Sequence, residues 1–554
     1  MSYSLLFFSV FTVFYPCFLL FTFGAQDELA TVTRDVRSLP EKSIELPISQ
    51  LLPRGTLEVG ALAVGGDVEP TKPAILSNST VTDSATGDES LDKLPSSEKE
   101  ILLSTGVLLL LLMLGVILVI THCLQIWNIQ LLQMPVCATV LGILVGAIFK
   151  LGVHSNKTIL TQILALNEDV FFIFLLPPII FEGGISITRD ELGDHFFANF
   201  GTILWYAIFC TLVSFCFIGG LIHFCGLLHL FTPLTLRESF SFGALISSTD
   251  PVSVLSMFKH LPPNPTFHAL IVGESLFNDA ISIVLYKTIV TEGSSGLGMI
   301  ITSFLFTFFF SVIIGVGIGL ISAFVYKKVD LNRSENAANE VALMFLFAWG
   351  AYSVAESYSF SGIVSICFCG ITMGKYASPN LSEAAQAATE TLFSMTALLA
   401  ETVVFLFLGL AVFSFHHGGS ASLHFSIFWI VSVGRCISVY LTSILVNLWR
   451  DDKISPNFQH ALVICGLRGA IAFALSQRAK HDFGGSAGVA LLSITLFYSL
   501  FSIIVVGCTL KWILQRLGIF QLSPSSTHHP AIEREEKQYA YGTIKMLLLR
   551  IDNE

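Results

Sequence analysis

From residue 99 to residue 514, long apolar segments alternate with short polar ones, and this alternation restricts the chain to one class of fold. About 20 apolar residues are enough to cross a bilayer as a helix. The composition agrees, because 53% of the 554 residues are hydrophobic and only 12% are charged, whereas about 25% are charged in soluble proteins. The sequence therefore predicts an all-α polytopic membrane protein embedded in lipid.

The apolar segments give the expected positions of the helices. We expect about thirteen transmembrane helices, in the ranges 101–121, 134–150, 170–186, 197–222, 238–258, 268–290, 298–326, 338–356, 360–374, 385–414, 424–448, 459–477 and 487–514. The chain has no basic patch, so nucleic acid is not an expected partner.

The segments outside the membrane part differ from it in composition. Residues 1–25 are apolar and are interpreted as a signal peptide or an additional N-terminal helix, since the basic residues that open most signal peptides are missing. Residues 26–98 are polar and rich in Pro, Ser, Thr and Glu, which predicts a disordered segment. Residues 515–554 are expected to form a short tail after the last helix.

The distribution of Lys and Arg predicts how the helices are oriented. With the N-terminus on the lumenal or extracellular side, the loops facing the cytosol carry the larger share of Lys and Arg, as the positive-inside rule requires. The glycosylation sequons at Asn78 and Asn156 then fall on the lumenal side. We therefore expect a lumenal N-terminus and a cytosolic C-terminus.

Several ionisable side chains lie inside the expected helices. Charges at bilayer depth are costly, and they usually face the interior of the bundle and mark an ion or proton path. A buried ion pair that only fixes packing is the alternative for any single pair. The residues concerned are Glu182, Asp250, Glu274, Asp279, Glu401, Arg435 and Arg468.

The stretch GESLFND places four polar residues on one expected helix. Residues four apart share a helix face, so Glu274 aligns with Asn278 and Ser275 aligns with Asp279. Ser275 and Asp279 offer oxygen ligands of the kind that small hard cations prefer. We expect Glu274 to pair with Arg435 and Asn278 to brace this pair.

Two helices are expected to be broken near the middle of the membrane. Pro251 removes a backbone donor and disfavours helical geometry at Asp250, so the first break is placed beside Thr249 and Asp250. The second is placed at Gly466–Gly469, around Arg468. Broken helices in two inverted repeats are typical of transporters, and their free backbone groups bind ions.

Two glutamates are further candidates for the same cavity. Glu182 follows Pro177 and Pro178, which predict a kink, and it is expected to face the ion site, or else to lie at the membrane interface near the helix end. Glu401 is expected either to pair with Arg468 or to line the inner vestibule.

Six motifs together resemble one family. In chain order they are FFIFLLPPIIFEGG, STDPVSVL, GESLFNDA, AETVVFLFLGL, GRCIS and GLRGAIAFAL. They are similar to the sodium/proton exchanger family of monovalent cation/proton antiporters, over roughly residues 100–515. VAESYSFSGIVSI, WRDDKISP and the short tail look closest to the Golgi and endosomal branch of that family.

The resemblance implies a fold and a set of roles. The implied fold is that of the inverted-repeat antiporters, with crossing broken helices, and the implied assembly is a homodimer. Such a protein is a secondary active transporter and not an enzyme, and it needs no cofactor. It implies a Golgi or endosomal membrane, with the plasma membrane as the alternative. The implied roles are the essential aspartate (Asp279), the first broken-helix motif (Thr249, Asp250, Pro251), further ion ligands (Ser275, Glu182), the buried bridge (Glu274, Arg435) and the second break (Gly466, Gly469).

The expected mechanism centres on one carboxylate. Burial penalises a charge, so Asp279 is expected to hold either a proton or a partly dehydrated Na⁺, and the protein changes conformation only with one of them bound. Relatives with two adjacent aspartates are electrogenic, and Asn278 in the first position predicts electroneutral exchange. Ser248 replaces the more usual Ala beside the site and is a candidate for altering cation preference.

Two other functions remain as alternatives at this point. A K⁺/H⁺ exchanger has the same fold, and Li⁺ is a further candidate cation. An intramembrane aspartyl protease also needs two aspartates on neighbouring helices. That class is expected to carry a Gly-x-Gly-Asp stretch, which is absent around both Asp250 and Asp279.

Overall fold

The structure is a computed structural model of the chain, and it describes residues 96–127, 133–152, 170–231, 233–258, 264–293, 296–329, 337–414, 418 and 421–520. The predicted N-terminal leader, almost all of the polar segment that follows it and nearly the whole tail lie outside these residues. So do both sequons, Asn78 and Asn156.

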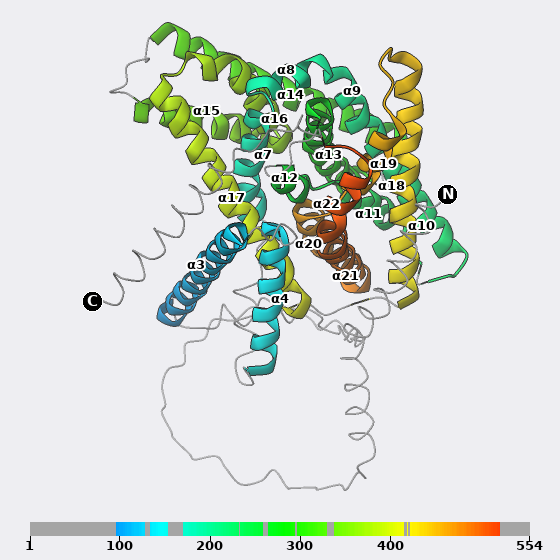
Figure 1. The fold of residues 1–554 in the computed structure, drawn as a ribbon. Coiled ribbons are helices and arrows are strands. Elements are labelled where there is room, and N and C mark those ends of the chain that lie inside the picture. Colours follow the sequence, from blue (N-terminus) through cyan, green and yellow to red (C-terminus); the bar gives the residue numbers. More distant parts are fainter. Residues whose placement is uncertain are drawn as a thin grey trace, which may run out of the picture. The chain divides into compact units, whose positions relative to one another are not determined.

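Helices make up the described part of the chain, which contains no β-strand (Figure 1). In order they are α3 (Ser96–Ile126), α4 (Met134–Gly152), η1 (Phe171–Leu175), α7 (Leu176–Ser186), α8 (Asp190–Ala198), α9 (Phe200–Trp205), η2 (Tyr206–Cys210), α10 (Thr211–Leu227), α11 (Leu236–Ser247), α12 (Val252–Phe258), α13 (Pro265–Glu292), α14 (Leu297–Val329), α15 (Ala337–Ser357), α16 (Gly362–Thr372), η4 (Met373–Ala377), η5 (Ser378–Asn380), α17 (Glu383–Ser414), α18 (Ala421–Trp449), α19 (Pro456–Cys465), α20 (Ala470–Phe483), α21 (Gly485–Phe501), η6 (Ser502–Val506) and α22 (Gly507–Arg516).

The all-helical prediction is confirmed, but the expected number of spans is not. Each expected range contains helix. Within the described residues, however, only nine helices are long and apolar enough to cross a membrane, or ten if the bent pair α19 and α20 is one span. The segment Phe171–Ser186 is shorter, and α11 and α12 are separated by a break. Pro177 and Pro178 follow directly on the π-helical turn η1, inside a helix that is continuous from Phe171 to Ser186, and the kink expected at them stays a prediction.

The described helices pack into two groups. One, which we call the site bundle, consists of α10 to α13 and α18 to α22. The other, the flanking bundle, consists of α3, α4, α7 and α14 to α17. The bundles meet mainly where α13 lies against α14, α16 and α7, and where α17 lies against α20 and α21.

Close helix packing in the flanking bundle depends on small residues, as is usual in membranes. Helices α4 and α17 approach through Gly142 and Gly409, and a side-chain carbon at either position would collide with the backbone of the other helix.

Candidate cation-binding site

The first break lies between α11 and α12, as the sequence predicted from Pro251. Helix α11 ends at Ser247, and Ser248 has extended backbone angles (φ −63°, ψ 138°). The Asp250 carboxylate then accepts the backbone N–H of Val252 at 3.0 Å, through Oδ1, and so caps the start of α12. The other carboxylate oxygen of Asp250 is buried and has no hydrogen-bond partner.

The second break, between α19 and α20, crosses the first. The axes of α19 and α20 differ by 45°. The backbone N–H of Asp250 donates to the carbonyl of Leu467 at 2.8 Å. Arg468, in the non-helical segment between α19 and α20, donates through Nη1 to the carbonyls of Ser247 at 2.6 Å and Ser248 at 2.8 Å. Residues of the second break therefore form hydrogen bonds with backbone N–H and C=O groups of the first break that have no partner within a helix.

Glycine is required where the two breaks touch. A side-chain carbon at Gly469 would overlap the Asp250 carboxylate, and one at Gly466 would overlap the Arg435 guanidinium. Neither residue has a backbone angle that demands glycine, so close approach is the reason for both.

Helix α13 presents its polar residues to the first break. The hydroxyl of Thr249 donates to Ser275 Oγ at 3.2 Å and accepts from the Asn278 amide at 3.2 Å. Ser282 donates to the Asn278 carbonyl oxygen at 3.1 Å. All of these side chains are buried. Thr249 thus links the break to the helix that carries Asp279.

Asp279 has the least satisfied carboxylate of this cluster. Its side chain is 4% exposed, and its buried Oδ1 has no hydrogen-bond partner. Leaving a buried charged oxygen unpaired is costly, and both Asp279 and Asp250 have one. A proton or a cation at this position would remove that cost.

A cavity of ≈ 70 Å³ opens beside these aspartates. It is large enough for a small cation with a few waters. Its lining includes Ser248, Thr249, Asp250, Asp279, Glu182, Glu401 and Gly469. Glu182 is held in place on α7 by the hydroxyl of Ser394 on α17, which donates to its Oε1 at 3.3 Å. The structure thus brings Glu182 to the same cavity as the two aspartates.

Glu274 and Arg435 lie within ion-pair distance, but Asn278 does not brace them. Arg435 Nη1 is 2.6 Å and Nη2 3.3 Å from the two Glu274 carboxylate oxygens, and Nη2 also donates to the Leu462 carbonyl at 2.8 Å. The expectation for Asn278 was wrong because its amide nitrogen donates to Thr249 and its carbonyl oxygen accepts from Ser282, so its hydrogen bonds go to these residues and not to the pair.

The expected pairing of Glu401 with Arg468 is also wrong. Arg468 is fully buried and donates through Nη1 to two carbonyls of the first break, while its Nε and Nη2 have no hydrogen-bond partner. Glu401 lines the cavity from α17, which is the position that the vestibule alternative required.

Sequence reasoning missed two contributions to the site. One is the use of Arg468 to hold the carbonyls of the opposite break. The other is the hydroxyl of Ser282, one turn after Asn278, which orients the Asn278 amide. The spacing of four residues between Asn278 and Ser282 was a usable signal for the second contact.

Comparisons with known proteins agree with the arrangement of the helices. A family model described as sodium/hydrogen exchanger, transmembrane, matches residues 107–516. Sodium/hydrogen exchanger 5 of Arabidopsis thaliana is 35% identical over 444 residues, which cover 78% of this chain and 84% of that protein. Sodium/hydrogen exchanger 8 of Homo sapiens is 37% identical over 377 residues, which cover 66% of this chain and 64% of that protein. The match therefore spans less than two thirds of the human relative.

A solved structure shares the fold. The sodium proton antiporter MjNhaP1 of Methanocaldococcus jannaschii superposes with a TM-score of 0.54 at 17% sequence identity. The superposition covers 75% of this chain and 99% of that one.

Proposed function

Because the chain belongs to the sodium/hydrogen exchanger family, we propose that it is an electroneutral Na⁺/H⁺ antiporter in which Asp279 binds either the cation or the proton. The observation that carries this proposal is the buried, unpartnered oxygen of Asp279 on the cavity beside the crossing of two broken helices.

The proposed oxygen ligands for the cation come from three segments. Asp279 on α13, Asp250 and Thr249 at the first break and Glu182 of the flanking bundle line the cavity, and Ser275, whose hydroxyl is bonded to Thr249, is the remaining proposed ligand. Such ligands suit a small hard cation. A proton on Asp279 and a cation beside it would both neutralise the same carboxylate, so each excludes the other.

The balance of buried charge supports electroneutral exchange. Among the described residues, the site bundle buries three carboxylates, Asp250, Glu274 and Asp279, and two guanidinium groups, Arg435 and Arg468. Three negative against two positive charges leave one negative charge, which one Na⁺ or one H⁺ cancels. The cost of moving an uncompensated buried charge then restricts the movement of the site bundle to its loaded forms.

The resemblance to the organellar branch supports a Golgi or endosomal membrane as the location, with pH regulation there as the role. We place the N-terminus in the lumen and the tail in the cytosol, from the distribution of Lys and Arg. A homodimer is part of the same proposal. Residues 1–25 as a leader, 26–98 as a polar lumenal segment and glycosylation at Asn78 and Asn156 complete it.

A K⁺/H⁺ exchanger is the second candidate function. Ser248 is the proposed determinant of cation preference, because it is buried and lines the cavity beside the aspartates. The family match leaves no support for the protease alternative.

Proteoliposomes with an enclosed pH indicator test the proposal. An imposed Na⁺ gradient should change the internal pH with the wild-type chain and should not with Asp279→Asn, which keeps the size of the side chain but cannot exchange a proton. The same vesicles with K⁺ and Li⁺ gradients distinguish the second candidate. Transport at the wild-type rate by Asp279→Asn would refute the role of this residue.

A further inference from the structure

An ion pair joins the two bundles at the end of α13 that faces away from the cavity. Lys287 lies eight residues after Asp279 (287 − 279), about 12 Å further along the helix. Its Nζ is 3.3 Å from Oε2 of Glu356 on α15 and 3.4 Å from the carbonyl oxygen of Phe360. Lys287 belongs to the site bundle and Glu356 to the flanking bundle. We call the Lys287–Glu356 pair the latch.

The flanking bundle holds Glu356 in a fixed position. Its second oxygen, Oε1, accepts the backbone N–H of Gly362 at 2.9 Å, in the first turn of α16. A side-chain carbon at Gly362 would overlap the Tyr352 ring and the Glu356 side chain, so the Glu356 side chain is closely packed. The Phe360 ring stacks on Phe310 of α14, with centroids 5.5 Å apart and planes at 10°.

A second contact between the bundles lies at the same end. The Arg478 guanidinium of α20 is 5.6 Å from the centre of the Phe172 ring in the flanking bundle. Asp482, one turn after Arg478, accepts the hydroxyl of Tyr286, the neighbour of Lys287, at 2.8 Å. Two cationic side chains of the site bundle therefore contact the flanking bundle at this end.

The cavity lies on the other side of the ion site. The residues of α13 that line it, Val272 and Leu276, precede Asp279, whereas Lys287 follows it. Ser186, at the end of α7, also lines the cavity. Along α13, therefore, the cavity lies on the N-terminal side of Asp279 and the latch on the C-terminal side, while along η1 and α7 the lining runs from Phe171 to Ser186.

We propose that Lys287 and Glu356 form a gate that is closed while the ion site faces the N-terminal side of α13 and opens when the site bundle moves to expose the other side. This inference rests on the proposed function, because it assumes alternating access. The two side chains are 40% and 37% exposed, and a pair this exposed changes an equilibrium by only about 1.4- to 5-fold. A weak pair suits a gate that must break in every transport cycle.

The latch is tested by a conformational readout that does not depend on transport. The full-length chain carries Ser186→Cys as a reporter in the cavity, in lipid nanodiscs, and peptide mass spectrometry measures the rate at which a maleimide labels residue 186. Reading residue 186 alone keeps the native cysteines from interfering. Lys287→Glu should lower this rate, by at most about fivefold, because two carboxylates then face each other and the state with the open cavity is disfavoured.

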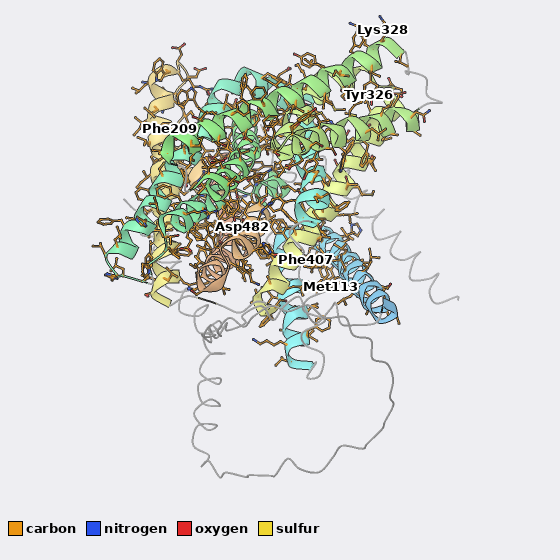
Figure 2. All side chains as sticks on the ribbon, turned by 180° about the vertical axis from the view of Figure 1, so that it is seen from behind. Met113, Phe209, Tyr326, Lys328, Phe407 and Asp482 are labelled. Atoms are coloured by element: carbon orange, nitrogen blue, oxygen red, sulfur yellow. The ribbon has the colours of Figure 1, made fainter. Side chains whose placement is uncertain are left out.

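The charge-swapped variant and a matched control make the test specific. Lys287→Glu combined with Glu356→Lys should restore the rate to within about twofold of the parent. Lys328→Glu makes the same charge change at an exposed position near the end of α14 and should leave the rate unaltered. Figure 2 shows Lys328 well separated from Asp482, which marks the latch end of the site bundle. If Lys287→Glu does not fold, Lys287→Gln replaces it and should also lower the labelling rate at residue 186.

The outcomes separate the latch from the proposed function. An unaltered labelling rate in a Lys287→Glu protein that still exchanges Na⁺ for H⁺ overturns the latch, as does a charge-swapped variant no faster than Lys287→Glu alone. A labelling rate that falls and recovers as described, in a chain that exchanges no cation, supports the latch and overturns the proposed function.

Discussion

The buried pair of Glu274 and Arg435 gives the sharpest prediction about stability. Glu274 is 2% and Arg435 5% exposed, and both oxygens of the carboxylate face the guanidinium. Arg435→Ala leaves Glu274 buried without a counter-charge. Breaking a buried pair from one side costs about 3–5 kcal/mol, which for a chain of 554 residues corresponds to a melting temperature lower by about 3–4 °C.

Removing both charges should cost less than removing one. The double variant Glu274→Gln/Arg435→Met leaves no charge at this pair, and its main loss is the hydrogen bond from Arg435 to the Leu462 carbonyl. A hydrogen bond from a charged group contributes about 1.5–3 kcal/mol. The double variant should therefore melt above Arg435→Ala, and the two substitutions should not be additive.

An exposed pair in the same protein is the control. Arg189 and Glu390 are 3.2 Å apart, but their side chains are 23% and 64% exposed. Exposed pairs contribute about 0–1 kcal/mol, so Glu390→Gln should barely change the melting temperature.

Thermal unfolding of the purified variants in detergent, followed by intrinsic fluorescence, measures these differences. Equal losses for Arg435→Ala and Glu390→Gln would refute the reasoning from burial. A double variant that melts below Arg435→Ala would refute the claim that an unpaired charge is the source of the loss.

The remaining predictions concern the ion site. Gly469→Ala should strongly reduce transport, because the added carbon overlaps the Asp250 carboxylate, whereas Gly317→Ala, which meets no atom within 4 Å, should leave the rate unchanged. Thr249→Val removes a hydroxyl that bonds to two side chains of α13; it should raise the half-saturating Na⁺ concentration in a flux assay, and an unchanged value would argue against that role. Asn278→Asp adds a buried negative charge, so its exchange should respond to an imposed membrane potential, and insensitivity to the potential would contradict the charge balance.

Local sequence patterns were sufficient to place much of the site. Pro251 located the first break, because proline excludes a helical donor and restricts the residue before it. The cost of a charge in the membrane singled out Arg435 as a partner for Glu274, and the two lie within ion-pair distance; the grouping of Ser275 with Asp279 as ion ligands stays a prediction.

Contacts between distant helices were not accessible in the same way. The bond from Asp250 to Leu467 and the bonds from Arg468 to the first break join segments far apart in the chain, and no local pattern encodes their pairing. The number of spans stays unconfirmed for a related reason. A hydropathy profile does not distinguish short and broken helices from full spans, because it does not register where the backbone leaves the helical geometry.

The central claim is that one Asp279 carboxylate exchanges one cation for one proton. Simultaneous measurement of Na⁺ uptake and H⁺ release in the same proteoliposomes, with the membrane potential clamped at zero and then at inside-negative values, tests it most directly. We expect equal fluxes of the two ions and the same rate at both potentials. Unequal fluxes, or a rate that changes with the potential, would contradict the claim.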